Sequence, residues 1–209
     1  MTCVQEVMMD FSTVKANLEK KGYKVSCFET KEEAAAYIKS NVNGKTIGIG
    51  GSASAQQMNL YHILSENNTV YSHAYLPEGK TVAEIRLAAC RSEVYISSVN
   101  GIAETGELVN IDNTGNRLAG TLYGPGKVYL LVGNQKITKN LDEAIYYARN
   151  VASPKNAQRL KRKTPCAVKG DKCYNCQSEE RICRALCVFW EKPTGCNYEI
   201  ILVNEELGY

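Results

Sequence analysis

The chain has 209 residues, a formal net charge of +3, 44% hydrophobic residues and 22% charged residues. This length is enough to bury a core without disulfides, and so small a net charge does not favour nucleic-acid binding. No apolar run approaches the ~20 residues that cross a membrane, and charged residues interrupt residues 1–23, where a signal peptide needs an apolar stretch. We therefore expect a cytoplasmic protein that binds neither membranes nor nucleic acid, in a compartment that keeps thiols reduced.

Helix and strand patterns alternate along most of the chain. Apolar residues from Val4 to Leu18 recur at helical spacing, and capping-box pairs predict helices that begin after Thr30 and Thr81. Further helices are predicted after Ser52 or Ser54 and after Asn140. Runs rich in Val, Ile and Tyr predict strands at 23–28, 46–49, 68–76, 93–98 and 127–133. This alternation predicts an α/β fold with a mostly parallel sheet.

The composition changes at Pro154. We predict an α/β domain over residues 1–153 and a basic, cysteine-rich segment over residues 154–209, which ends in a strand and belongs to the same domain. The basic run KNAQRLKRK (155–163) is either a solvated helix face or a surface that docks an acidic partner or an anionic ligand. It lacks interleaved aromatic residues, which argues against nucleic acid.

A glycine turn follows the predicted strand at 46–49. The stretch GIGGSAS (48–54) lies where this strand gives way to a helix. Glycines there would let backbone N–H groups approach a phosphate or carboxylate, and the helix N-terminus would add its unpaired donors. The alternative is a tight structural turn, because the match to a dinucleotide-binding fingerprint is loose.

A second polar stretch, residues 98–117, is dense in Gly, Asn and Asp. Glu104 follows two apolar residues within it, and burial would raise the pKa of its carboxyl group and suit acid–base or nucleophilic chemistry. The alternative is a solvated glutamate in a loop. Arg117 is a candidate counter-ion for Glu104 or a clamp for an anion. The chain has two histidines, His62 and His73, and no hydrolase motif.

Six of the nine cysteines lie within residues 166–196. Four of these six follow the spacing C-x6-C-x2-C-x6-C, namely Cys166, Cys173, Cys176 and Cys183. Four thiolates satisfy either zinc or an iron–sulfur cluster, and the spacing does not choose between them. A redox-active thiol pair and unliganded cysteines remain as alternatives. The isolated cysteines are expected to be small buried side chains, namely Cys3, Cys27 and Cys90.

Several stretches together resemble the LUD domain family, which includes LutC-type lactate-utilisation proteins. They follow one another from about residue 45 to the C-terminus: GIGGSAS, NGIAETGELVNIDNTGNRLAG, GPGKVYLLVGNQKI, NAQRL, TPC, CYNCQSEERIC and LGY. The resemblance implies a Rossmann-like fold of the NagB/RpiA/CoA transferase-like kind. It also implies an accessory redox component of lactate or related 2-hydroxy-acid utilisation, which binds a small anionic ligand and works with iron–sulfur oxidoreductase proteins.

The same resemblance implies the positions of the site residues. Glu104 takes the catalytic role, and the ligand contacts are Gly50, Gly51, Ser52, Ser54, Thr105, Gly106, Gly133, Asn134 and Lys136. An iron–sulfur cluster or zinc is the expected cofactor, bound by Cys166, Cys173, Cys176 and Cys183. Two alternatives stay open: an enzyme that resembles CoA transferases or sugar-phosphate isomerases and uses Glu104, and a zinc-stabilised interaction module.

Overall fold

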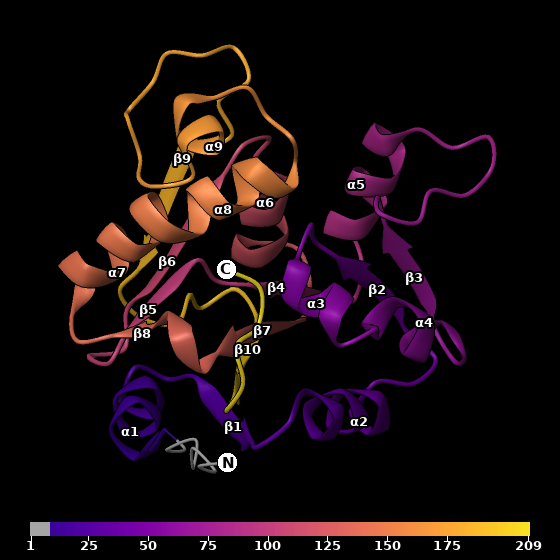
Figure 1. Cartoon of the computed structure of the whole chain (residues 1–209). Coiled ribbons are helices and arrows are strands. Elements are labelled where there is room, and N and C mark those ends of the chain that lie inside the picture. The colour runs from indigo at the N-terminus through magenta and orange to yellow at the C-terminus, as the bar shows by residue number, and fades with distance from the viewer. Residues whose placement is uncertain (1–8) are drawn as a thin grey trace, which may run out of the picture.

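The structure is a computed structural model that describes residues 9–209 (Figure 1). The first part of the helix predicted from Val4, and Cys3 with it, lie outside the described residues. Within the described range, no helix is long and apolar enough to cross a membrane.

The main sheet has six parallel strands, which confirms the predicted Rossmann-like α/β fold. Their spatial order is β1 (Lys24–Phe28), β10 (Asn197–Val203), β7 (Lys127–Gly133), β4 (Val94–Ser98), β2 (Thr46–Ile49) and β3 (Thr69–Ser72). β10 is the last strand of the chain and pairs with both β1 and β7. The C-terminal segment therefore supplies an interior strand of this sheet.

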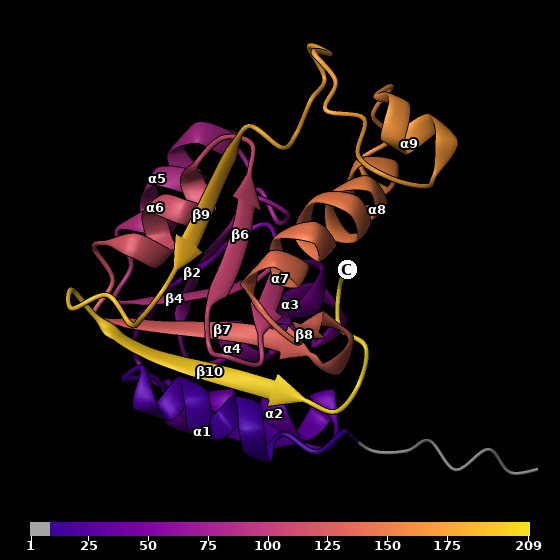
Figure 2. The ribbon, with the colours of Figure 1, turned by 90° about the vertical axis from the view of Figure 1, so that its left-hand side faces the viewer.

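A second, smaller sheet lies across the first, as Figure 2 shows for β6 and β9. Its order is β8 (Ile137–Thr138), β5 (Gly101–Ala103), β6 (Leu108–Asp112) and β9 (Ala185–Phe189). β5 and β6 form an antiparallel hairpin inside the stretch that sequence reasoning treated as a polar turn, and β9 was not predicted. These three strands escaped prediction because β5 is only three residues long, β6 contains an asparagine and an aspartate, which are uncommon in strands, and β9 lies among the cysteines.

Six helices flank the main sheet in the described chain: α1 (Ser12–Lys20), α2 (Lys31–Asn41), α3 (Ala53–Gln57), α4 (Leu60–Ser65), α5 (Val82–Cys90) and α6 (Asn116–Leu122). α7 (Leu141–Tyr147) packs on the second sheet, and α8 (Ser153–Arg159) and α9 (Pro165–Lys169) follow it away from the main sheet (Figure 2). Side chains alternate along β7, so that Leu130 packs with α1 and the second sheet while Leu131 packs with α2, α3 and α4. This alternation divides the apolar core into two layers, one on each face of the sheet.

The predicted helix starts are confirmed at several positions. Thr30 and Thr81 each form the complete capping box with the glutamate three residues later, and Ser52 caps α3. The helix expected after Ser52 is broken, because Asn59 adopts a left-handed φ of 52° between α3 and α4. Cys27 is exposed rather than buried, since β1 is an edge strand that α1 covers only in part.

One long helical stretch continues through Pro154. α7 is followed without a break by a π-helical turn, Ala148–Ala152, and then by α8, which has the proline in its first turn. Proline has no backbone N–H to donate and crowds the preceding turn, and here it follows directly on the π-helical turn, where the regular α-helical hydrogen bonding is already interrupted. The basic run is therefore held in part on a helix that packs on the second sheet at its start.

Candidate functional site

The carboxyl ends of the parallel strands meet at one edge of the main sheet. His73 follows β3, Gly51 follows β2, Asn100 follows β4, and Lys136 follows β7. The chain leaves β2 toward β3, whereas it leaves β4 toward β7 on the other side. Such a reversal between neighbouring strands opens a crevice at the carboxyl edge, which is where ligands bind in open α/β sheets.

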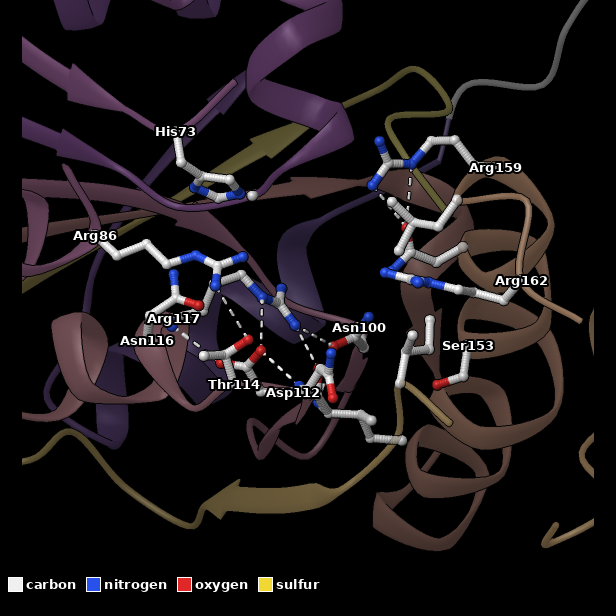
Figure 3. A pocket seen from close by; sticks show the side chains of 16 residues that line it. His73, Arg86, Asn100, Asp112, Thr114, Asn116, Arg117, Ser153, Arg159 and Arg162 are labelled. Carbon is white, nitrogen blue, oxygen red and sulfur yellow. Dashed lines mark hydrogen bonds and ion pairs between the residues drawn. The ribbon is translucent and has the colours of Figure 1, made fainter. Parts of the chain in front are cut away.

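A cavity of about 160 Å³ lies at this edge (Figure 3). Its wall is formed by residues after the strands, by the loop between β6 and α6, and by α5 and α8. The polar side chains that line it are His73, Arg86, Asn100, Asp112, Asn113, Thr114, Asn116, Arg117, Ser153, Asn156, Arg159 and Arg162. Four of these are arginines and one is a carboxylate, so the cavity carries an excess of positive charge.

Arg117 is largely buried, with 12% of its side chain exposed. Its guanidinium donates hydrogen bonds to the Ile111 carbonyl and, over 3.3 Å, to the Asn100 side chain. One carboxylate oxygen of Asp112 lies 3.8 Å from the Arg117 Nε. The other oxygen accepts hydrogen bonds from two backbone N–H groups in the first turn of α6, those of Arg117 at 2.9 Å and Leu118 at 3.2 Å. Because Asp112 is shared in this way, its charge offsets only part of the cavity's positive charge.

Arg86 and Arg159 face the cavity from α5 and α8. Figure 3 shows Arg86 beside Arg117 on one side of the cavity and Arg159 with Arg162 on the other. Within the described part of the chain, the buried Nε of Arg86 has no hydrogen-bond partner. Burial lowers the pKa of His73 below its ordinary value, and the charges of Arg86 and Arg159 lower it further. His73 is therefore a neutral side chain on the cavity wall near neutral pH.

Lys136 lines a smaller recess that adjoins the cavity. The recess has a volume of about 30 Å³ and shares Gly51, Asn100, Arg117 and Asn156 with the larger cavity. Lys136 is only 1% exposed, and its amine lies 3.3 Å from the Ser54 hydroxyl. Among the residues that the structure describes, no carboxylate forms an ion pair with it.

The environment of Lys136 disfavours its charged form. Burial lowers the pKa of this amine to about 7, and the neighbouring charge of Arg117 contributes to the shift. Gly208 closes the recess from the far end of the chain, and a Cβ on this residue would lie 3.2 Å from the lysine nitrogen. The φ of Gly208 is +69°, so glycine is favoured there on backbone grounds as well.

Residues of the glycine turn lie in this region, and their role as ligand contacts stays a prediction. Gly51 lines both the cavity and the recess, and Ser54 contacts Lys136. Ser52 caps α3, and its hydroxyl lies 3.1 Å from that of Ser98, which lines the recess. Gly50 leaves room for two neighbouring side chains, because a Cβ at this position would lie 2.9 Å from the Tyr95 hydroxyl and 3.1 Å from the Arg117 Cγ.

Glu104 lies elsewhere in the structure. It begins the turn between β5 and β6, where its backbone N–H donates to Thr138 and its carbonyl accepts from the Asn17 side chain. Thr105 and Gly106 occupy the same turn, beside α1. None of these three residues lines the cavity or the recess. The catalytic role of Glu104 therefore stays a prediction that the geometry of the cavity does not support.

Two further predicted contacts, Gly133 and Asn134, face the C-terminal segment. A Cβ on Gly133 would lie 2.4 Å from the backbone nitrogen of Leu207, and the Asn134 backbone donates to the Glu205 carbonyl over 3.2 Å. They hold the segment that carries Gly208 and do not themselves line the recess.

The four predicted metal ligands are not gathered around one point. Across residues 9–209, no group of three or more His, Cys, Asp or Glu side chains is arranged to hold a metal ion. Cys173 and Cys183 line a separate hollow of about 230 Å³, whereas Cys166 lies 3.3 Å from the Thr164 hydroxyl. Arg181 organises this segment by donating to the carbonyls of Cys176 and Cys183, each over 2.8 Å. The side chains as placed do not fit a four-thiolate centre, and the metal site stays a prediction.

Several cavity residues were not singled out from the sequence. They are Arg86, Asn100, Asp112 and Asn156. Asn100 follows β4, Asp112 ends β6 and Asn156 lies in the basic run, whereas the position of Arg86 within α5 gave no signal. Arg117 was considered as an anion clamp, and Arg159 and Arg162 belong to the basic run for which an anionic ligand was one interpretation.

Comparison with known proteins gives the class of this chain. The family model described as "LUD domain" matches residues 12–203, so the chain belongs to the LUD domain family. A crystal structure of a DUF162 family protein from Deinococcus radiodurans is similar to it with 12% sequence identity and a TM-score of 0.48, over 93% of this chain and 99% of that one. Comparison with curated proteins finds no match.

Proposed function

We propose that this LUD domain protein binds a small carboxylate or phosphate anion in the arginine-lined cavity, as an accessory component of the utilisation of lactate or a related 2-hydroxy acid. Membership of the family supports the pathway, and the charge of the cavity supports the ligand. An iron–sulfur oxidoreductase is the partner that this role requires. The proposal assigns the chain a ligand and a pathway and no chemical step.

The observation that carries the proposal is the charge imbalance within one cavity. Four arginines line the cavity, and Asp112 is the one acidic side chain that the described structure places on its wall. Like charges held together in a partly desolvated space raise the free energy of the folded chain, and a bound anion relieves this repulsion. Guanidinium groups also match the planar geometry of carboxylate and phosphate oxygens.

The volume of the cavity limits the size of the ligand that it can enclose. Its volume of about 160 Å³ is close to that of an engineered 150 Å³ cavity that holds benzene, so a ligand of about six non-hydrogen atoms fills it. A three-carbon hydroxy or oxo acid has this size, and so does an inorganic phosphate with one bound water. A nucleotide or an intact coenzyme A would extend far outside the cavity.

Calorimetric titration with lactate, pyruvate and inorganic phosphate tests the proposal and separates the carboxylate from the phosphate source. Arg159→Gln removes a cavity charge from an exposed position on α8, where the side chain donates hydrogen bonds within the same helix, to Asn156. Because a hydrogen bond to a charged group contributes about 1.5–3 kcal/mol, affinity should fall about tenfold to a hundredfold. Arg91→Gln is the matched control, since Arg91 is exposed and lines neither space.

Two results would contradict the proposal. One is the absence of saturable binding by all three anions at low ionic strength, where electrostatic attraction is strongest. The other is an equal loss of affinity in Arg159→Gln and Arg91→Gln, which would indicate a general response to net charge rather than a site.

The alternative hypothesis is a CoA-transferase-like or isomerase-like enzyme that uses Glu104. It has less support, because Glu104 lines neither the cavity nor the recess. If Glu104→Gln abolished an acyl-CoA transfer or isomerase activity of the purified protein, this alternative would replace ours. A zinc-stabilised interaction module is favoured only if the purified chain carries stoichiometric zinc and binds none of the anions.

A further inference from the structure

Lys136 is a buried amine whose surroundings do not explain its presence. It is 1% exposed, and its nitrogen has the Ser54 hydroxyl at 3.3 Å as its hydrogen-bond partner in the described structure. A buried lysine is ordinarily paired with a carboxylate, because desolvating an ammonium group is costly. Here the charged side chain that acts on it is Arg117, which has the same sign.

The recess in front of this amine is narrow. Its volume of about 30 Å³ accommodates one or two waters or a single small polar group. The adjoining cavity of about 160 Å³ holds the body of a small acid, and Arg117 borders both spaces. An acid whose carboxylate lies on Arg117 can therefore extend one short substituent toward Lys136. For a 2-oxo acid, that substituent is the carbonyl group next to the carboxylate.

We propose that Lys136 forms an imine with the carbonyl carbon of a small 2-oxo acid whose carboxylate is held by Arg117. This inference rests on the proposed function, because the same cavity must bind the acid. The neutral amine attacks the carbonyl carbon to give a carbinolamine. The carbon–oxygen bond then breaks and a carbon–nitrogen double bond forms, and the oxygen leaves as water with the two protons of the amine. A proton from solvent converts the imine to its charged form.

The surroundings favour each part of this step. A lysine acts as a nucleophile only when it is uncharged, and desolvation beside another cation is an established way to reach that state near neutral pH. Burial and Arg117 lower the pKa of Lys136 to about 7, so about half of the molecules hold the free amine at that pH. The Ser54 hydroxyl is within hydrogen-bonding distance and can carry protons between the nitrogen and the departing oxygen.

Reductive trapping tests the inference directly. The full chain is incubated at pH 7 with pyruvate and borohydride, and its intact mass and tryptic peptides are then measured. An imine should add the mass of the acid less one oxygen atom, and the modified peptide should contain Lys136. Mapping on the wild-type chain identifies the lysine without relying on any variant that fails to fold.

Matched probes and variants separate the outcomes. Lactate lacks the carbonyl and should give no adduct, whereas acetone lacks the carboxylate and should give at least about tenfold less than pyruvate. Lys136→Arg should abolish the adduct, and Lys139→Arg should retain it, because Lys139 is an exposed lysine of the same connection. An adduct spread over exposed lysines, or confined to a lysine other than Lys136, would overturn the inference. Saturable binding of pyruvate with no trapped adduct would overturn it and leave the proposed anion site intact.

Discussion

Replacing Lys136 by methionine should stabilise the protein at low pH and not at high pH. Methionine is unbranched and of similar length, so it fills the same space without a charge. The pKa of Lys136 is lowered from 10.5 to about 7 in the folded chain. At about 1.4 kcal/mol per pH unit, this difference corresponds to a desolvation cost of about 5 kcal/mol when the amine is protonated in both states.

The sign follows from proton binding. Below pH 7 the folded and the unfolded chain both hold the proton, and the folded chain carries the full cost. Between pH 7 and pH 10.5 the folded amine is neutral while the unfolded one is charged, so unfolding takes up a proton and the wild-type protein becomes more stable as the pH rises. The stability advantage of Lys136→Met should therefore be largest near pH 6 and should shrink by about 5 kcal/mol on approaching pH 10.5. Loss of the Ser54 hydrogen bond adds a penalty of about 1 kcal/mol that does not depend on pH.

Urea unfolding followed by circular dichroism from pH 6 to pH 10, with a thiol reductant and without phosphate or small carboxylates, measures this difference. Other titrating groups are common to both proteins and cancel. Lys139→Met, at an exposed position, should give a difference that is flat with pH. A flat difference for Lys136→Met as well would show that the buried amine keeps its ordinary pKa, and the reasoning about the recess would be refuted.

Three further predictions concern other parts of the structure. Burial raises the pKa of Glu199, but hydrogen bonds from Lys127, Ser26 and Tyr37 outweigh this effect and hold the pKa at about 2. In an acid titration the wild type should therefore lose about 3 kcal/mol of stability between pH 4.5 and pH 2, as the carboxylate is protonated. Glu199→Gln should lack this loss. Gly48→Ala should cost at least about 3 kcal/mol in urea unfolding or prevent folding, because its Cβ would lie 2.1 Å from a backbone oxygen of α5. Cys173→Ser and Cys176→Ser should each lower the zinc or iron content of anaerobically purified protein if the cysteines bind a metal; wild-type content in both would reject them as ligands.

The sequence predicted the features of the fold that depend on local chemistry. Thr30 and Thr81 mark helix starts because their hydroxyls satisfy backbone donors three residues away, and this signal is complete within four residues. Buried strands such as β7 were visible as short apolar runs. The left-handed Asn59 and the helix that continues past Pro154 were missed, since each depends on how the segment packs rather than on the local pattern.

The candidate site was harder to predict because its charge comes from distant parts of the chain. Arg86, Arg117 and Arg159 lie on three different helices and meet only once the sheet order is known. Each is an ordinary surface arginine by local criteria. The glycine turn and Lys136 were predicted as ligand contacts because they follow strands directly, and the structure places them at the cavity and its recess. Glu104 was favoured by its neighbours in sequence and is separated from the cavity by the direction of the β5–β6 hairpin.

Arginine and lysine respond differently to burial, and this difference explains why the cavity is lined by arginines whereas the buried cation of the recess is Lys136. An arginine keeps its charge in any protein environment, so the four arginines lie around the larger cavity, where Asp112, polar side chains and an incoming anion can stabilise them. Within the described structure no carboxylate forms an ion pair with Lys136, which is 1% exposed, and an arginine at position 136 would remain a desolvated charge. A lysine can instead lose its proton, which turns an unfavourable buried cation into a neutral amine. Position 136 therefore suits lysine alone among the basic residues, and the property that makes lysine acceptable there also makes it a nucleophile.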